Sequence, residues 1–263
     1  MNKFDLKDRI DSIIYGSYNI LSDILFVFNF KAKKLLENNK SYKVIEGKNR
    51  CFILGTGPSL RSIPNEFLDF LSTEATIGVN FLYKSDIFNK VKPKYYALVD
   101  DLFWGDLSNV FSDVYEAYGE QKPIFITDYR AEKLVQKEGV FIYAKNYPTK
   151  GVRLDLSRNS SALMNVVSYS IASAIFLGFK EIYLLGCDYN AFCSGGAGHC
   201  YDDGDLKNDN INLAYFLKFY HLTTEFHYLL SKEAKRLGVK VINITEGSLL
   251  DAYPRKSFAD IKW

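Results

Sequence analysis

A chain of 263 residues is long enough for one large domain with appendages, and 48% hydrophobic and 24% charged residues are ordinary for a folded globular protein. The formal net charge of +2 argues against nucleic acid as the main partner. The spacing of the four cysteines matches no common zinc pattern and no signal peptide is visible, so we expect reduced thiols and a cytoplasmic location.

Residues 1–48 are expected to form a helical extension that differs from the rest of the chain. Isoleucines and leucines recur near helical spacing between positions 10 and 25, and three phenylalanines then precede three lysines. Asp23 interrupts this run, which is too polar to span a bilayer. Three interpretations remain open: the helix packs on the domain, pairs with a second copy of the chain, or contacts a membrane surface through residues 10–34. The last would place the protein peripherally on the inner face of the cytoplasmic membrane.

Residues 49–263 predict a single Rossmann-like α/β domain, preceded by a polar linker at 37–47. Apolar runs predict strands at 51–54, 76–80, 94–99, 123–127, 140–143, 181–185 and 239–244. Helical patterns cover 64–71, 163–177 and 212–237. The alternation of strands and helices predicts a mostly parallel sheet that is covered on both faces. Residues 190–210 are rich in Gly, Ser, Asp and Asn, which predicts a mobile lid loop.

The first predicted strand ends in a glycine turn with the sequence GTGPSL at positions 55–60. The two glycines let the backbone turn tightly and approach a ligand, and Pro58 and Ser59 suit the first turn of a helix. Such a strand–turn–helix unit is the usual phosphate cradle of nucleotide-binding α/β folds. The motif is neither G-x-G-x-x-G nor a Walker loop, so an ordinary tight connection stays open. Its place at the head of an α/β pattern favours the ligand interpretation.

Polar residues follow several of the predicted strands at their carboxyl ends. Ligands of open α/β sheets bind beyond these ends. One polar strand end is routine turn chemistry, whereas four or five in one sheet predict a rim for a ribose, a phosphate and an acceptor. The members of this rim are Gly55, Thr56, Gly57, Asn80, Asp100, Asp101, Asp188, Tyr189 and residues 245–248.

The lid loop contains one of the three histidines of the chain, His199, with a glycine before it. A histidine there can swing over a substrate and take a proton near neutral pH, although a solvent-exposed loop histidine is an equal alternative. Asp202, Asp203 and Asp205 could hold a divalent ion, but turn chemistry is favoured for them. His221 and His227 lie on the last long helix, where packing is the better interpretation.

Three segments resemble the bacterial sialyltransferases of glycosyltransferase family 42: GTGPSL at 55–60, VN at 79–80 and LGFKEIYLLGCDY at 177–189. They are also similar to surface-polysaccharide proteins with a domain like the archaeal hydroxymethylpterin pyrophosphokinase. The resemblance covers roughly residues 48–258. It implies a Rossmann-like domain of GT-A variant type that binds a nucleotide sugar. It also implies a CMP-activated donor, a surface glycan or glycolipid acceptor, and an inverting reaction that needs neither metal nor cofactor.

The resemblance also implies roles for individual residues. The turn and the asparagine would hold the CMP part through Gly55, Thr56, Gly57, Ser59 and Asn80, with Asp188 in the same site. Ser160 and Ser161 are the nearest match to a serine–glycine pair of the family. Asp100 stands where the family has a second asparagine. An ionised aspartate only accepts hydrogen bonds, so Asp100 would bind ribose hydroxyls or a metal in place of phosphate.

His199 is the only histidine in the loop where the family carries its acceptor-activating base. Tyr189 and Tyr201 are the candidate donors to the departing CMP. Two alternatives remain. A magnesium-dependent, pyrophosphokinase-like enzyme would hold the metal through Asp100, Asp101 or residues 202–205. A non-catalytic nucleotide-binding subunit of polysaccharide assembly would bind a nucleotide without turnover.

Overall fold

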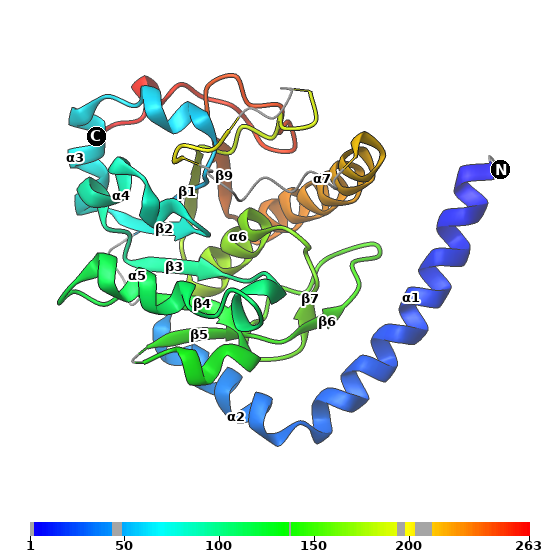
Figure 1. Ribbon diagram of the computed structural model, residues 1–263. Helices are drawn as coiled ribbons and strands as arrows, with labels where there is room; N and C mark the ends of the chain where they lie inside the picture. Colours follow the sequence, from blue (N-terminus) through cyan, green and yellow to red (C-terminus); the bar gives the residue numbers. More distant parts are fainter. Residues whose placement is uncertain (1–2, 44–48, 137, 194–197, 203–211) are drawn as a thin grey trace.

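The computed structural model describes residues 3–43, 49–136, 138–193, 198–202 and 212–263, with side chains of the first helix from Arg9 onward. A seven-stranded sheet forms the centre, in the order β5-β4-β3-β2-β1-β8-β9 (Figure 1). Its strands are β1 (Arg50–Leu54), β2 (Ala75–Val79), β3 (Tyr95–Leu98), β4 (Ile124–Asp128), β5 (Gly139–Ile142), β8 (Glu181–Leu185) and β9 (Lys240–Asn243). Every pairing between these strands is parallel, which confirms the predicted Rossmann-like α/β fold.

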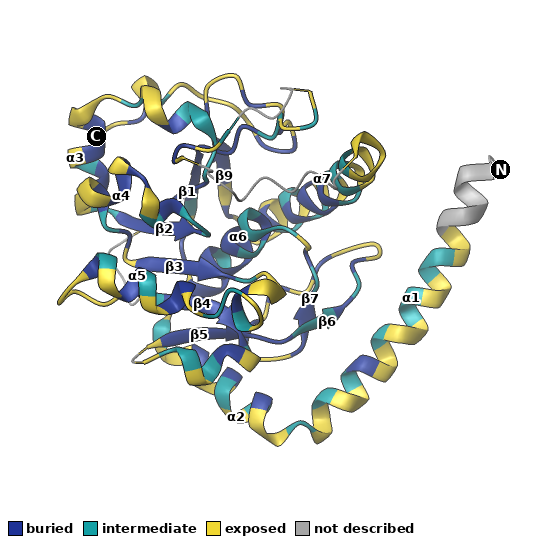
Figure 2. Cartoon of the chain, viewed as in Figure 1, coloured by how far each residue is buried: buried dark blue, intermediate teal, exposed yellow. Residues whose placement is uncertain are grey.

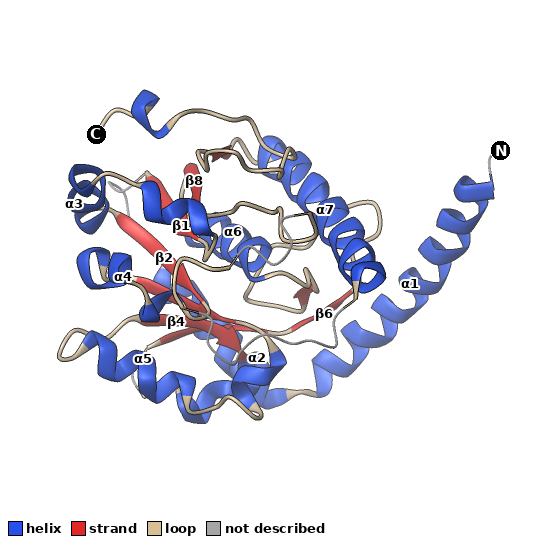
Figure 3. Cartoon of the chain, turned by 45° about the horizontal axis from the view of Figure 1, so that its top comes forward, coloured by secondary structure: helices blue, strands red, loops and turns tan. Residues whose placement is uncertain are grey.

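Helices cover both faces of the sheet (Figure 3). They are α3 (Asn65–Thr73), α4 (Asp86–Val91) and α5 (Val110–Tyr118) on one face, and α6 (Val166–Leu177) and α7 (Leu213–Arg236) on the other. In β1, Phe52 belongs to the core on the α3–α5 side and Ile53 to the core on the α6 side. Both side chains are fully buried, which explains why the central strands are continuous apolar runs.

Capping residues set the ends of α6. Asn165 caps its start, because its side chain accepts hydrogen bonds from the backbone N–H groups of Val167 and Ser168. The helix therefore begins at Val166, three residues later than its apolar pattern predicted. Gly178, with a φ of 105°, ends it in the left-handed conformation, as expected.

The N-terminal extension consists of two helices, α1 (Lys3–Phe28) and α2 (Phe30–Asn38). Ala32 and Leu36 of α2 are buried against Phe141 and Tyr143, at the β5 edge of the sheet. The linker predicted at 37–47 is wrong for its first part, because Asn39 is fully buried. Its amide donates to the carbonyls of Phe141 and Leu156 and accepts from the N–H of Phe141. Residues 44–48 lie outside the described structure.

Helix α1 runs past the body of the molecule and contacts β6 (Ala144–Asn146), which pairs with β7 (Ser160–Ser161) in a small second sheet (Figure 1). Many of its side chains are exposed (Figure 2). No single helix of the described chain is long and apolar enough to cross a bilayer. Residues 9–28 and 30–42 meet the length and composition criterion only together, as a pair bent by 87°.

Candidate functional site

The centre of the candidate site is the point where the order of the sheet reverses, between β1 and β8. From β1 the chain builds β2 to β5 on one side, and it then returns to add β8 and β9 on the other. In open α/β sheets such a switch point forms a crevice at the carboxyl ends of the strands, where ligands bind. The glycine turn at 55–60 follows β1, and Gly186 and Asp188 follow β8.

Here the two strand ends touch each other. The N–H groups of Gly55 and Gly57 donate to the carbonyls of Leu185 and Gly186, both at 2.8 Å. A Cβ added to Gly57 would lie 1.7 Å from Oδ2 of Asp188, and one added to Gly55 would lie 2.3 Å from the oxygen of Gly186. The glycines of the turn are therefore required for the close contact between the segments that follow β1 and β8.

The carboxylate of Asp188 occupies the place that an anion would take at this turn. Its Oδ1 accepts from the N–H of Ser59 at 3.2 Å and its Oδ2 from the Ser59 hydroxyl at 2.7 Å. Asp188 itself is 8% exposed. We call Gly55, Gly57, Ser59, Gly186 and Asp188 the β1–β8 clasp. Its N–H groups at positions 55, 57 and 59 are bonded within the protein, so the predicted phosphate contacts at these three positions are not open in this structure.

The described end of the predicted lid, residues 198–202, is attached to the same turn. The N–H of Cys200 donates to the carbonyl of Thr56 at 2.8 Å. Nη2 of Arg61 donates to the carbonyls of His199 at 2.6 Å and of Tyr201 at 3.3 Å, across 138 and 140 positions of sequence. These bonds place the exposed His199 beside the carboxyl end of β1. Residues 194–197 and 203–211, on either side of this segment, lie outside the described residues.

The imidazole of His199 lies flat against a neighbouring ring. It stacks on Tyr201 with 4.9 Å between ring centroids and 3° between ring planes. Tyr201 is buried and makes an edge contact with Phe81, which follows β2. The two predicted catalytic residues on the lid are therefore held together, next to the residue that follows Asn80.

Asn80 has a left-handed backbone conformation, which asparagine tolerates better than most residues other than glycine. Its φ is 49°, its N–H donates to the carbonyl of Ala97 and its carbonyl accepts from the hydroxyl of Tyr96. Its side-chain oxygen Oδ1 is buried without a hydrogen-bond partner in the described structure. Met164 and Tyr189 also have positive φ, of 52° and 56°. A left-handed backbone costs most residues other than glycine about 1–3 kcal/mol and is enriched at functional sites. Asn80, Met164 and Tyr189 follow strands or precede α6 at the carboxyl side of the sheet, whereas Lys92, with a φ of 43°, ends α4.

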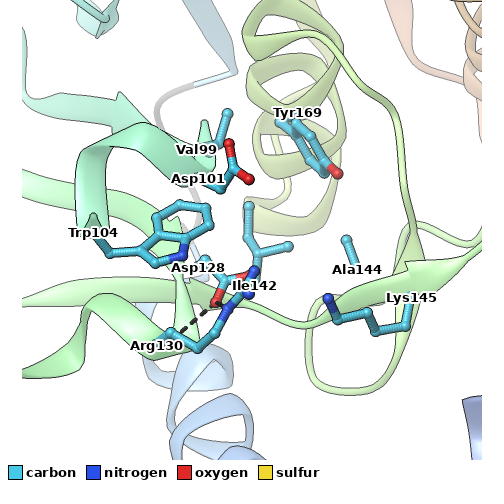
Figure 4. Close-up of a pocket in the computed structure, with 9 residues that line it drawn as sticks. All are labelled: Val99, Asp101, Trp104, Asp128, Arg130, Ile142, Ala144, Lys145 and Tyr169. Carbon is cyan, nitrogen blue, oxygen red and sulfur yellow. Dashed lines mark hydrogen bonds and ion pairs between the residues drawn. The ribbon is translucent and has the colours of Figure 1, made fainter. Parts of the chain in front are cut away.

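A small pocket lies at the carboxyl ends of β3, β4 and β5 (Figure 4). Its volume is about 150 Å³. Arg130 binds Asp128 through two hydrogen bonds of 2.7 and 3.1 Å and stacks over the ring of Trp104. Burial raises the pKa of the Tyr169 hydroxyl to about 12, so this phenol stays a neutral hydrogen-bond donor. The pocket thus combines aromatic rings with planar polar groups and is lined by Val99, Asp101, Trp104, Asp128, Arg130, Ile142, Ala144, Lys145 and Tyr169.

Asp100 and Asp101 stand at the entrance to this region, after β3. Burial raises the pKa of Asp100, and the neighbouring Asp101 raises it further, while the N–H of Leu102 opposes both effects. Within the described ranges, no three His, Cys, Asp or Glu side chains gather as a metal site would require. Of the other predicted metal ligands, Asp202 lies within these ranges and Asp203 and Asp205 lie outside them.

Three other predicted site residues face different parts of the protein. The Tyr189 hydroxyl bonds Thr223 of α7, and its ring contacts Tyr220 and His227. Ser160 and Ser161 are buried in β7. Their hydroxyls bond the carbonyl of Tyr143 and the N–H of Arg153, so the structure does not bring them to the turn with Asn80 and His199.

The other two histidines, His221 and His227, lie on α7, outside the candidate site, as the sequence predicted. His227 is fully buried between the hydroxyls of Ser168 and Tyr253, and burial lowers its pKa to about 3. The imidazole is therefore neutral and serves packing. His221 is exposed on α7 and lies 3.9 Å from Glu225.

Sequence reasoning missed Arg61 and the residues that line the small pocket other than Asp101. Arg61 follows the glycine turn as a single basic residue, and no local pattern indicates that it binds the lid. Trp104 and Arg130 come from two different loops, and only the parallel pairing of β3 with β4 brings them together. The one sequence feature that could have indicated Trp104 and Arg130 as site residues is their position shortly after predicted strands.

The fold is shared with a solved structure, the MAf glycosyltransferase from Magnetospirillum magneticum AMB-1, with a TM-score of 0.53 and 13% sequence identity. The superposition covers 89% of this chain and 39% of that one, so the chain spans about two fifths of the length of that protein. At this identity the likeness establishes the fold. No protein-family profile and no curated protein sequence matches the chain.

Proposed function

We propose that the protein is a glycosyltransferase that moves a sugar from a nucleotide-activated donor to a glycan or glycolipid acceptor. The fold shared with a protein named a glycosyltransferase supports this class. The observation that carries the proposal is the attachment of residues 198–202 to the glycine turn through Cys200 and Arg61. It holds His199 over the carboxyl edge of the sheet, where a base can reach a bound substrate.

The donor is a CMP-activated acid sugar, as the resemblance to sialyltransferases implies. The buried Oδ1 of Asn80 is an acceptor that lacks a donor. Ribose hydroxyls and the cytosine amino group supply such donors, whereas an ionised phosphate offers only acceptors. We therefore assign the binding of the nucleoside to Asn80 and Asp100. In this assignment the β1–β8 clasp does not contact the nucleotide and instead stabilises the backbone of the site. This changes the role expected for the glycine turn, whose N–H groups at 55, 57 and 59 are already bonded.

In the reaction, the imidazole of His199 takes the proton of the acceptor hydroxyl as that oxygen attacks the anomeric carbon. The bond from this carbon to the phosphate oxygen breaks on the opposite face, so the configuration inverts and CMP leaves with the electron pair. Tyr201, stacked on His199, is better placed than Tyr189 to donate a hydrogen bond to the departing phosphate. The pocket lined by Trp104 and Arg130 receives the acceptor sugar.

Replacing His199 with alanine tests the base. A positioned general base contributes about 10²- to 10⁴-fold, so transfer falls by that factor while CMP affinity measured by calorimetry stays within about twofold. His221→Ala is the matched control, because His221 is an exposed histidine on α7. Turnover of His199→Ala equal to that of the control removes His199 from the mechanism.

Calorimetric binding of CMP, UDP, GDP and ATP, each with EDTA and with magnesium, tests the donor. CMP binding in EDTA, followed by hydrolysis of CMP-sugars, is the expected result. ATP binding only with magnesium would support the pyrophosphokinase-like alternative, with Asp100 and Asp101 as metal ligands. CMP binding without hydrolysis or transfer would support a non-catalytic subunit. Either of the last two results overturns the proposal.

A further inference from the structure

Helix α1 is attached to the domain through one side, and this attachment is specific. Tyr15 stacks on Tyr147 with 3.7 Å between ring centroids. Asn19 donates to the carbonyl of Tyr147 at 2.9 Å and accepts from its N–H at 2.7 Å. Asp23 pairs with Arg153 at 2.7 Å. Because these contacts fix the rotation of α1 about its axis, the side that points away from the domain is also defined.

The outward side of α1 and the start of α2 is almost entirely apolar. Eleven large hydrophobic side chains are each at least half exposed there, and together they present on the order of 1,000 Å² of surface, more than the largest apolar patch of a typical monomer. Asp11 and Asp23 are the only charged residues between positions 10 and 30. Asp23 binds the domain and Asp11 lines the groove between α1 and α7. The eleven residues are Ile10, Ile13, Ile14, Tyr18, Ile20, Leu21, Ile24, Leu25, Val27, Phe28 and Phe30.

The width of this surface distinguishes between the partners that could cover it. It includes adjacent pairs such as Ile20 with Leu21 and Ile24 with Leu25, so it extends around about half of the helix. Pairing with one helix of a second copy buries mainly the positions of a heptad seam and leaves the flanks in water. A lipid surface covers the whole half at once, as it does for helices that lie in the membrane interface.

The charges next to the apolar surface agree with a membrane. Three lysines follow Phe30, at positions 31, 33 and 34, and Arg9 precedes Ile10. Lys31 is paired with Glu132, whereas Lys34 is exposed. Basic residues at the ends of an interfacial helix are attracted to anionic headgroups, by about 1 kcal/mol each.

We propose that α1 lies in the interface of an anionic membrane, with its outward side toward the acyl chains and the α/β domain on its other side. Helix α1 contacts β6, which continues from the carboxyl end of β5 (Figure 1). The membrane therefore lies on the side of the sheet where Asn80 and His199 are found. The membrane contact itself does not depend on the reaction that the site performs.

Sedimentation of the full chain with lipid vesicles tests the membrane contact. The vesicles contain phosphatidylcholine alone, or phosphatidylcholine with about one quarter phosphatidylglycerol. We expect binding to the anionic vesicles and about tenfold or greater loss of binding in the triple variant Ile13→Asn, Ile20→Asn, Phe28→Asn. The matched control is Leu213→Asn, Leu237→Asn, Leu249→Asn, three exposed leucines outside α1. The control should bind like wild type, and Lys33→Glu with Lys34→Glu should weaken binding to the anionic vesicles only.

A second measurement keeps the test independent of folding. Ile20→Trp adds a fluorophore on the outward side to the native Trp104 and Trp263. Relative to the wild type, its emission should shift to the blue and be quenched by brominated lipid chains when vesicles are added. Wild-type binding by the Ile13, Ile20 and Phe28 triple variant would overturn the proposal. Absence of wild-type binding to the anionic vesicles would also overturn it. A dimer in solution that the triple variant dissociates would then show that a second copy covers α1.

Discussion

Replacing Gly57 with alanine is the smallest change that tests the β1–β8 clasp. Gly57 has a φ of −67° and a ψ of 152°, which alanine adopts freely, so the penalty comes from contact alone. The added Cβ would lie 1.7 Å from Oδ2 of Asp188 and 2.7 Å from the carbonyl oxygen of Gly186. The carboxylate must rotate away, and the two hydrogen bonds from Ser59 are then lost or lengthened.

The expected loss in the free energy of unfolding is about 3 kcal/mol. Overpacking a tight site costs about 1–3 kcal/mol. Each hydrogen bond to a charged group contributes about 1.5–3 kcal/mol, but hydrogen bonds to water at the turn replace part of this loss. Urea unfolding followed by far-ultraviolet circular dichroism measures this difference. Gly151→Ala is the control, because a Cβ there meets no atom within 4 Å, and we expect a change within about 0.5 kcal/mol.

A double-mutant cycle shows whether Asp188 causes the penalty. In the Asp188→Ala background the closest contact of the new Cβ becomes the Gly186 oxygen at 2.7 Å. Gly57→Ala should then cost about 1 kcal/mol less than it does in the wild type, which is a coupling well above the error of such cycles. The role of the β1–β8 clasp would be refuted if Gly57→Ala were as stable as the Gly151→Ala control. It would also be refuted if the stability losses of Gly57→Ala and Asp188→Ala were strictly additive.

Two further predictions concern buried polar residues. Asn39→Leu should lower the free energy of unfolding by about 3 kcal/mol or more, because three buried backbone groups lose their hydrogen-bond partner. Asn38→Leu, at an exposed position, should change it little, and urea unfolding measures both variants. Equal losses in the two variants would contradict the role of the Asn39 amide. The pKa of His227 is lowered from 6.5 to about 3 by burial, so the unfolded chain binds a proton that the folded chain does not. Stability should therefore fall by about 1.4 kcal/mol per pH unit below 6.5 because of this residue. His227→Phe should make the acid slope shallower and His221→Phe should not; an unchanged slope in His227→Phe would show that another group causes the acid loss.

The sheet was predictable from the sequence because its strands are buried on both faces. Runs such as 51–54 and 182–185 are buried and free of charged residues, and the strands predicted at 51–54 and 181–185 lie within one residue of the bounds of β1 and β8. The linker predicted at 37–47 was wrong because a polar composition does not reveal burial. Asn39 is buried at no apparent cost, since backbone groups more than a hundred positions away satisfy its amide.

The candidate site could be predicted only in outline. The glycines at 55 and 57 indicated a close approach of the backbone, but the sequence could not show that Asp188 makes that approach. A carboxylate and a ligand phosphate present the same acceptor chemistry to the turn, so the motif alone does not separate them. His199 was predicted as a candidate base from its place in a glycine-flanked loop and from a family resemblance, whereas Arg61, which donates to its carbonyl, has no local signature.

The order of the sheet also has a consequence for synthesis of the chain on the ribosome. Strand β1 finds its neighbour β2 within about twenty residues, but its other neighbour, β8, is made more than a hundred residues later. At about 5–20 residues per second, one edge of β1 waits roughly ten seconds for its partner. During that time the unpaired N–H and C=O groups of β1 form an open edge next to apolar side chains, which favours pairing with another chain. We therefore expect the nascent protein to be most prone to aggregation before residue 185 has emerged, and to need protection by chaperones over that interval.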